Sequence, residues 1–225
     1  MYEILSSQVF GIMMTTFFYL FGNYLYQKTK FPLFSPLLVA TILIMLYVKI
    51  ASIDLDTFLT DLSGINVFLG PLIVSLAIPI AKQRELIKKN LLPIVIGSIV
   101  GAIVSVFSVL ILGKAFNLDL EIIASVIPKS TTTPIAIEIS NRLGGIRAIT
   151  VAVVVISAVL GAIIIPIIIK IFKIKDPMII GMGLGSSSNA IGTAKAIEID
   201  SRSGAFAGVA LVLSGIATVI ITLFL

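Results

Sequence analysis

The chain has 225 residues, of which 58% are hydrophobic and 12% are charged, with a formal net charge of +5. Soluble domains carry roughly a quarter charged residues, so this composition excludes an ordinary soluble enzyme, a disordered tail and a nucleic-acid-binding module. Cysteine, histidine and tryptophan are absent, which excludes disulfides, haem ligation by histidine, most zinc sites and a histidine general base.

Long stretches without charged residues dominate the chain. A transmembrane helix needs about 20 mostly apolar residues. The stretches of that length are Ile4–Gln27, Phe31–Val48, Leu62–Ala81, Asn90–Gly113, Ala148–Ile169, Pro177–Ala194 and Ala205–Leu225. Leu120–Ile139 is a further candidate, although Lys129 and Glu138 interrupt it.

These stretches predict an all-α polytopic membrane protein with about eight hydrophobic segments. We expect a single integral membrane domain over residues 1–225, with a four-helix N-terminal half (1–117) and a C-terminal half (118–225) that contains two broken helices. The first segment lacks the basic start and the small-residue cleavage site of a signal peptide, so we expect it to remain as an anchor.

The basic loop residues predict the orientation. Lys28 and Lys30 follow the first segment, and the basic stretch Lys82–Lys89 follows the third, whereas the loop Asp54–Asp61 is acidic. Because positively charged loops are normally cytoplasmic, we expect the N-terminus outside the cytoplasm. An even number of segments places the C-terminus there as well.

The fifth segment contains a predicted helix break. Pro128 and Pro134 bracket a run of one lysine and four hydroxyl residues. Proline removes a helical hydrogen bond and disfavours helical angles in the residue before it. We therefore expect a half-helix ending near Ile127, an extended stretch, and a second half-helix with Pro134 in its first turn and Thr132 or Thr133 as its N-cap.

The seventh segment predicts a second break. Gly181, Gly183 and Gly185 alternate before a cluster of serines, and Gly192 follows shortly afterwards. Glycine weakens a helix, and serine and asparagine are good helix caps. The predicted helix-breaking residues of both segments are Pro128, Pro134, Gly183, Gly185 and Gly192.

The two broken segments resemble each other. A shift of 60 residues places Thr193 on Thr133, Ala196–Ile199 on Ala136–Ile139, Arg202 on Arg142 and Gly204 on Gly144. We interpret this match as an internal repeat. The repeat is parallel if both segments cross the membrane and inverted if the seventh alone turns back, and the short length of each segment favours crossing over a re-entrant course.

Paired segments that are interrupted by glycine or proline indicate a transporter site. The start of each half-helix offers free N–H groups and a positive dipole end, which bind anions. We expect the two breaks to face one another near the bilayer centre. The predicted substrate-binding residues are Lys129, Ser130, Thr131, Thr132, Thr133, Ser186, Ser187, Ser188, Asn189 and Thr193.

Structural roles remain open for these residues. Serine and threonine in membrane helices often bond to their own backbone or to a neighbouring helix. Prolines also kink helices that are simply packed. The ammonium group of Lys129 reaches the membrane interface if the break is shallow.

Charged pairs follow each break. Glu138 and Arg142 are four residues apart, as are Glu198 and Arg202, so each pair shares a helix face and is expected to form an ion pair. Lys195 is an alternative partner for Glu198. Since histidine is absent, one of these glutamates is also a candidate proton carrier. We predict no metal, cofactor or catalytic residue, because no nucleophile–base pair, metal cluster or nucleotide-binding loop is present.

The stretches IPKSTTTPIAIEIS and GLGSSSNAIGTAKAIE resemble the LrgB/CidB family of bacterial membrane proteins, as do FPLFSPLLVA and LGPLIVSLAIPIAKQ. The family often has a histidine where Asn189 stands. The resemblance implies the bacterial inner membrane and a small LrgA/CidA-like partner. It also implies two competing functions: an antiholin- or holin-like control of murein hydrolase export and autolysis, or transport, because a plant plastid relative carries glycolate and glycerate and bacterial relatives are linked to pyruvate uptake.

We favour a secondary carrier for small monocarboxylates of the pyruvate, glycolate and glycerate class. A holin acts by clustering and has no use for two matched polar breaks. The alternative is an antiholin-like modulator without a transport substrate, and a channel fits a lysine at the membrane centre less well. The expected partners are the carboxylate, the lipid bilayer and the small membrane protein, with a homo-oligomer left open and no nucleic acid.

Overall fold

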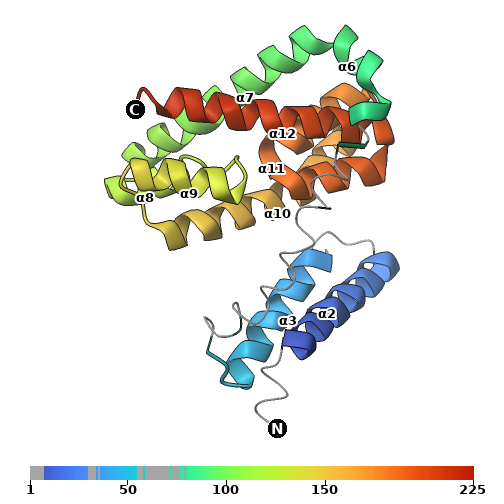
Figure 1. Ribbon diagram of the computed structural model, residues 1–225, viewed down its shortest axis with the longest axis vertical. Coiled ribbons are helices and arrows are strands. Elements are labelled where there is room, and N and C mark those ends of the chain that lie inside the picture. The colour runs from blue at the N-terminus through green and yellow to red at the C-terminus, as the bar shows by residue number, and fades with distance from the viewer. Residues whose placement is uncertain are drawn as a thin grey trace. The chain divides into compact units, whose positions relative to one another are not determined.

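The structure is a computed structural model that describes residues 8–29, 34, 36–54, 58, 71, 77, 78 and 80–225. The chain divides into two compact units, Met1–Ser75 and Leu76–Leu225 (Figure 1). This division falls ahead of the fourth predicted segment, which packs with helices of the second unit. The described elements are helices, and no strand occurs among the described residues.

The first unit contains two described helices that pack side by side, α2 (Gln8–Thr29) and α3 (Pro36–Ile50). Aromatic side chains join them. The ring of Tyr47 lies 6.2 Å from that of Phe10 and 6.5 Å from that of Phe18. Such pairs are favourable at these separations, so this contact holds α3 against α2.

The second unit is a bundle in which the last helix is central. Its helices are α6 (Arg84–Lys89), α7 (Leu91–Ala115), α8 (Leu120–Val126), α9 (Thr133–Arg142), α10 (Arg147–Ile171), α11 (Pro177–Ile199) and α12 (Ser201–Thr222). Small residues cover much of α12, and most of its first half is buried. Small side chains let helix backbones approach closely, which explains why α11 and α7 both pack against α12.

Helices α8 and α9 form a helical hairpin, hairpin 1, with its tip at Pro128–Thr132. As predicted, the first helix ends just before Ile127, Thr132 is the N-cap of the second, and Pro134 lies in its first turn. After α9 the chain comes back beside the end of α8, because the Ile146 N–H donates to Ser125 Oγ at 2.6 Å. Within this unit the segment therefore turns back between α8 and α9.

Helix α11 is also a hairpin, hairpin 2, with its tip at Asn189. This residue has non-helical angles, φ 52° and ψ −140°. Beyond it the chain turns back, since a Cβ on Gly192 would lie 2.0 Å from the Leu184 carbonyl oxygen. Ala196 accordingly packs in one apolar cluster with Ile180 and Leu184. The predicted break is present, and the chain turns back at it instead of continuing in one direction.

The glycines of hairpin 2 have a different role from the predicted one. Gly183 and Gly185 lie within the first arm of α11 and do not break it. A Cβ on Gly185 would lie 2.2 Å from the Ala207 carbonyl oxygen of α12, whereas the nearest atom to a Cβ on Gly183 is 3.8 Å away. Gly185 and Gly192 therefore permit close packing, and the turn itself falls on Asn189.

The hairpins approach each other from opposite ends of α7. Hairpin 1 lies near the end of α7, where a Cβ on Gly113 would touch Ile123 at 2.6 Å. Hairpin 2 lies near its start, where a Cβ on Gly97 would touch Met182 at 2.3 Å. Because hairpin 1 also meets the start of α10, α7 and α10 run in opposite directions. Figure 1 shows α8 and α9 at the end of the bundle away from α6.

Four described helices are long and apolar enough to cross a membrane: Val9–Thr29, Leu91–Ala115, Arg147–Ile171 and Ser201–Thr222. The predicted number of eight segments is therefore wrong for the described residues, and length and hydropathy identify no re-entrant helix among them. Helices α8 and α9 have only 7 and 10 residues, and the polar residues of α11 lower its hydropathy. The second predicted segment gives a shorter apolar helix, and the third, Leu62–Ala81, lies mostly outside the described residues.

Candidate functional site

The tip of hairpin 1 and the first arm of hairpin 2 contact adjacent turns of α7. Lys129 Nζ donates to Ser105 Oγ at 2.8 Å, and the hydroxyls of Ser130 and Ser105 are 2.9 Å apart. One turn earlier, Ser186 Oγ would be 3.9 Å from a Cβ on Gly101. Since one helical turn rises about 5.4 Å, α7 brings the two predicted clusters close together.

Helix α10 holds the same two tips from its own side. Ser157 Oγ donates to the Lys129 carbonyl oxygen at 2.9 Å. One turn later, a Cβ on Gly161 would lie 2.1 Å from Ser188 Oγ. These contacts fall near the middle of both α7 and α10. The structure thus brings Pro128–Thr133 and Gly185–Thr193 together between the two long helices.

Lys129 carries the one positive charge at this meeting point in the described part of the chain. Its ammonium group is half-buried and donates to Ser105, to the hydroxyl at 2.8 Å and towards the carbonyl at 3.5 Å. No acidic side chain of the described residues forms an ion pair with it. A partly buried charge without a counter-ion is unfavourable.

The start of α9 adds unused hydrogen-bond donors. The backbone N–H groups of Thr132, Thr133 and Ile135 donate to no described residue, and Pro134 has no N–H. Thr132 is the N-cap, yet its side chain makes no capping bond. Free N–H groups in the first turn of a helix carry partial positive charge. They lie close to Lys129 in the chain, so the tip of hairpin 1 (tip 1) is a compact group of hydrogen-bond donors.

Asn189 places an unpaired side-chain amide at the tip of hairpin 2 (tip 2). Its side chain is 5% exposed, and neither its amide nitrogen nor its amide oxygen has a hydrogen-bond partner. A buried polar group without a partner costs about 1–3 kcal/mol. Its positive φ adds strain of about 1–3 kcal/mol. Residues that combine strain with unpaired polar atoms concentrate at functional sites.

Several of the predicted hydroxyls already donate to the backbone. The bonds are Ser186 to Met182 O at 2.6 Å, Ser187 to Gly183 O at 2.6 Å, Thr131 to Pro128 O at 2.9 Å and Thr193 to Asn189 O at 3.0 Å. Ser188 Oγ lies 3.1 Å from Ser187 Oγ. These hydroxyl protons are in use, so the free donors are Lys129, Thr132, Thr133, the Asn189 amide and the first-turn N–H groups.

The sequence pattern of the LrgB-like family matches residues 15–225. The chain belongs to the LrgB-like family. The antiholin-like protein LrgB of Bacillus subtilis (strain 168) is 36% identical over 220 residues, which is 97% of this chain and 95% of that relative. The protein of the same name from Bacillus cereus (strain B4264) is 35% identical over 213 residues, 94% of this chain and 93% of that relative. No solved structure matches the chain with significance.

Family membership agrees with the apolar helices in describing a multi-pass membrane protein. The relatives carry the name of antiholin-like proteins, and neither their name nor the family description indicates a catalytic family. In the described residues of this LrgB-like chain, no three histidine, cysteine, aspartate or glutamate side chains are grouped as metal ligands.

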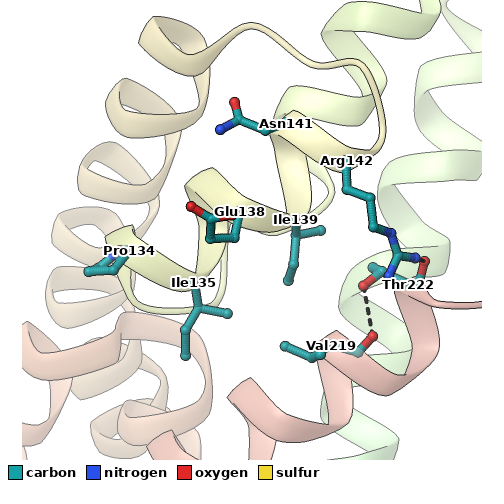
Figure 2. A pocket seen from close by; sticks show the side chains of 8 residues that line it. All are labelled: Pro134, Ile135, Glu138, Ile139, Asn141, Arg142, Val219 and Thr222. Atoms are coloured by element: carbon teal, nitrogen blue, oxygen red, sulfur yellow. Dashed lines mark hydrogen bonds between the residues drawn. The ribbon is translucent and has the colours of Figure 1, made fainter.

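The charged residues after each break pair differently from the sequence prediction. Arg142 does not bond Glu138 but donates to the Thr222 carbonyl oxygen at the end of α12 (Figure 2). Lys195 is the partner of Glu198, at 2.7 Å. Arg202 accordingly lies 3.0 Å from Asp200 and forms no ion pair with Glu198.

The sequence reasoning missed the residues that hold the tips of this LrgB-like chain. Ser105 and Ser157 are single hydroxyl residues within long apolar helices. The sequence around them does not indicate that they contact Lys129. Their only sequence signal is a polar residue near the middle of an apolar segment. Gly97 and Gly101, with their small-xxx-small spacing, face hairpin 2 within the chain.

Proposed function

We propose that this LrgB-like protein is a secondary carrier for small monocarboxylates of the pyruvate, glycolate and glycerate class. The observation that carries the proposal is the meeting of two helix breaks near the middle of α7 and α10. Lys129 lies there without an acidic partner among the described residues. A small anion would complete this group of donors.

The donors suit a carboxylate with a polar neighbour. The first-turn N–H groups of α9 and the ammonium group of Lys129 would bind the two carboxylate oxygens, because charge-assisted hydrogen bonds are the stronger ones. The amide of Asn189 offers one donor group and one acceptor. A keto or hydroxyl group beside the carboxylate would use one or the other.

The helix arrangement supports a carrier more than a pore. Helix α7 with hairpin 1 and α10 with hairpin 2 follow the same order, about 60 residues apart, and α7 and α10 are antiparallel. Inverted repeats whose broken helices meet at one site are typical of alternating-access carriers. If α7 and α10 cross the membrane, both tips lie at mid-depth. Transport would take place in the bacterial inner membrane, with a small LrgA/CidA-like protein as partner.

A second candidate is an antiholin-like modulator of murein hydrolase export and autolysis. The curated relatives are named antiholin-like proteins, and those names support this candidate more directly than they support transport. Such a modulator needs no transport substrate. It would leave the unpaired donors at the two tips without a role.

Uptake by purified protein in proteoliposomes tests the proposal. Labelled pyruvate, glycolate and glycerate would be supplied with and without the small partner. We expect saturable uptake of at least one acid and a loss of tenfold or more in Lys129→Met. Lys175→Met is the matched control, because Lys175 is an exposed loop lysine at the opposite end of the first arm of α11 from Asn189.

The two candidates give different results in this assay. Equal uptake by Lys129→Met and the unsubstituted protein would refute the carrier site. Leakage of unrelated solutes of similar size, without saturation, would favour the holin-like class. Absence of any flux together with altered autolysis in cells would favour the antiholin-like modulator.

A further inference from the structure

A cavity of about 740 Å³ lies between α9 and the end of α12. Figure 2 shows its charged lining on α9, with Glu138 one turn closer to Pro134 than Arg142. Ile135 and Val219 supply apolar wall. The cavity therefore extends along α9 from the end of the bundle towards tip 1. The distance from Arg142 to Pro134 along the helix is about 12 Å at 1.5 Å per residue.

Apolar side chains make up most of the lining of this cavity, and α9 adds exposed polar and charged residues to it. Pro134, Glu138, Asn141 and Arg142 are all exposed, whereas the opposite face, with Ala136, is buried. Glu138 forms no ion pair within the described residues. Charged residues inside membranes face the bundle interior or a water-filled cavity, so we expect water to reach Glu138 and Arg142 through this cavity.

Hairpin 2 differs at the equivalent place. Glu198, 60 residues after Glu138, is neutralised by Lys195 at 2.7 Å. Ile197 packs tightly against α12, where a Cβ on Gly204 would lie 2.4 Å from it. The two hairpins therefore differ in their second arms. At hairpin 1 the glutamate has no ion-pair partner among the described residues and lines a cavity, whereas at hairpin 2 it is paired with a lysine.

The basic residues indicate which end of the bundle this cavity opens to. The end at which α7 begins and α10 finishes carries Lys82, Arg84, Lys88, Lys89, Lys170, Lys173, Lys175 and Arg202. The end with the cavity carries Lys114, Arg142 and Arg147. Positive loops are normally cytoplasmic, so the cavity lies at the extracytoplasmic end.

We infer that the cavity between α9 and α12 is the extracytoplasmic entrance for the anion and that Arg142 captures it there. This inference rests on the proposed function and names the route to the same site. Arg142 uses one donor on the Thr222 carbonyl oxygen. A guanidinium group has five donors, so it still offers others to a carboxylate. The anion then passes Glu138, which repels it, and reaches the donors at tip 1.

Transport kinetics test the roles of the two charges. Arg142→Gln is expected to raise the KM for acid supplied outside by tenfold or more and to leave the KM for acid supplied inside unchanged. Glu138→Gln removes the repelling charge and is expected to lower the outside KM. Equal changes on both sides for Arg142→Gln, or a raised outside KM for Glu138→Gln, would overturn the inference.

Labelling tests the position of the entrance without depending on transport. Because the chain has no cysteine, a membrane-impermeant maleimide can label only the thiol that Asn141→Cys introduces. We expect labelling from outside in intact cells, slowed by saturating pyruvate, glycolate or glycerate. Ser201→Cys, 60 residues later, is the matched control and is expected to react only from the cytoplasmic side.

The outcomes separate this inference from the proposed function. Absence of carboxylate uptake by the unsubstituted protein overturns the proposed function even if Asn141→Cys reacts from outside. Uptake with Asn141→Cys reacting only from inside, or with labelling that no transported acid slows, overturns the inference alone.

Discussion

At the scale of single residues, hairpin 2 separates two uses of small and polar side chains. Asn189 makes the turn, with φ 52° and a buried amide that has no partner. Gly185 makes no turn but lies against the backbone of α12. One residue therefore holds strain at the tip, and the other sets the distance between two helices.

Substitutions at two neighbouring glycines measure this distance. Gly185→Ala places a methyl group 2.2 Å from the Ala207 carbonyl oxygen, and overpacking of this kind costs about 1–3 kcal/mol. Gly183→Ala meets nothing closer than 3.8 Å and gains up to about 1 kcal/mol of helix propensity. Thermal unfolding in detergent should show a lower midpoint for Gly185→Ala than for Gly183→Ala. Equal midpoints would contradict the packing of α11 on α12.

At the scale of elements, hairpin 1 is held at two levels. Its base is joined to α10 by the bond from Thr150 Oγ1 to Ser140 Oγ at 2.6 Å. Its tip is joined to α7 by the Ser105 and Ser130 hydroxyls, 2.9 Å apart. In the carrier mechanism the tip contacts the anion and the base only supports it. The two levels should therefore respond differently to a covalent bond.

Paired cysteines test this difference in a chain with no cysteine of its own. Ser105→Cys with Ser130→Cys and Ser140→Cys with Thr150→Cys both place the new sulfurs near disulfide distance. We expect both pairs to cross-link on oxidation. The tip pair should abolish carboxylate uptake until reductant is added, because the cross-link fixes the tip to α7 beside Lys129. The base pair should leave at least half of the uptake. Equal inhibition by both pairs would contradict a role of the tip of hairpin 1 in transport.

At the scale of the whole molecule, the direction of each long helix in the second unit follows from contacts. Helices α7 and α12 both begin at the end that holds α6, since Ile87, Ile94 and Phe206 share one apolar cluster. Helix α10 runs the other way. Because positive loops are normally cytoplasmic, we expect the chain to leave α12 outside the cytoplasm.

Reporter fusions test that orientation. An alkaline phosphatase domain fused after Leu225 should be active, because this enzyme folds in oxidising compartments where disulfides form. The same domain inserted after Lys173, in the loop between α10 and α11, should be inactive. Fluorescent-protein fusions that work only in the cytoplasm should give the reverse pattern. Phosphatase activity at both fusion sites would mean that the chain does not make a single crossing of the membrane between Lys173 and Leu225.

Local effects were predictable from the sequence, and long-range ones were not. Pro128 and Pro134 fix the first break through their own rings and missing N–H groups, so its limits agree with the structure. The return of hairpin 1 depends on Ile146 reaching Ser125, and no local pattern encodes that bond.

Among the residues that the structure describes, the count of eight segments failed for the same reason. Charge-free length cannot distinguish a crossing helix from two short arms that turn back. The second break shows a further limit. A glycine that breaks a helix and a glycine that lets two helices pack closely look identical in the sequence. Gly185 permits close packing, while the turn fell on Asn189. The two clusters of candidate site residues contact adjacent turns of α7, but the hydroxyl protons of Ser186 and Ser187 are bound to the backbone.

The two-sided support of hairpin 1 also constrains how the protein is made. Its tip bonds to Ser105 in a helix synthesised earlier and to Ser157 in a helix synthesised later. Lysine at the centre of an inserting helix costs about 2.5–3.5 kcal/mol, so residues 120–142 are poor substrates for insertion by themselves. We expect the ribosome to complete α10 before hairpin 1 takes its final place. Assembly of this half would then wait for the chain beyond it, and chains halted between residues 142 and 157 would remain open to protease.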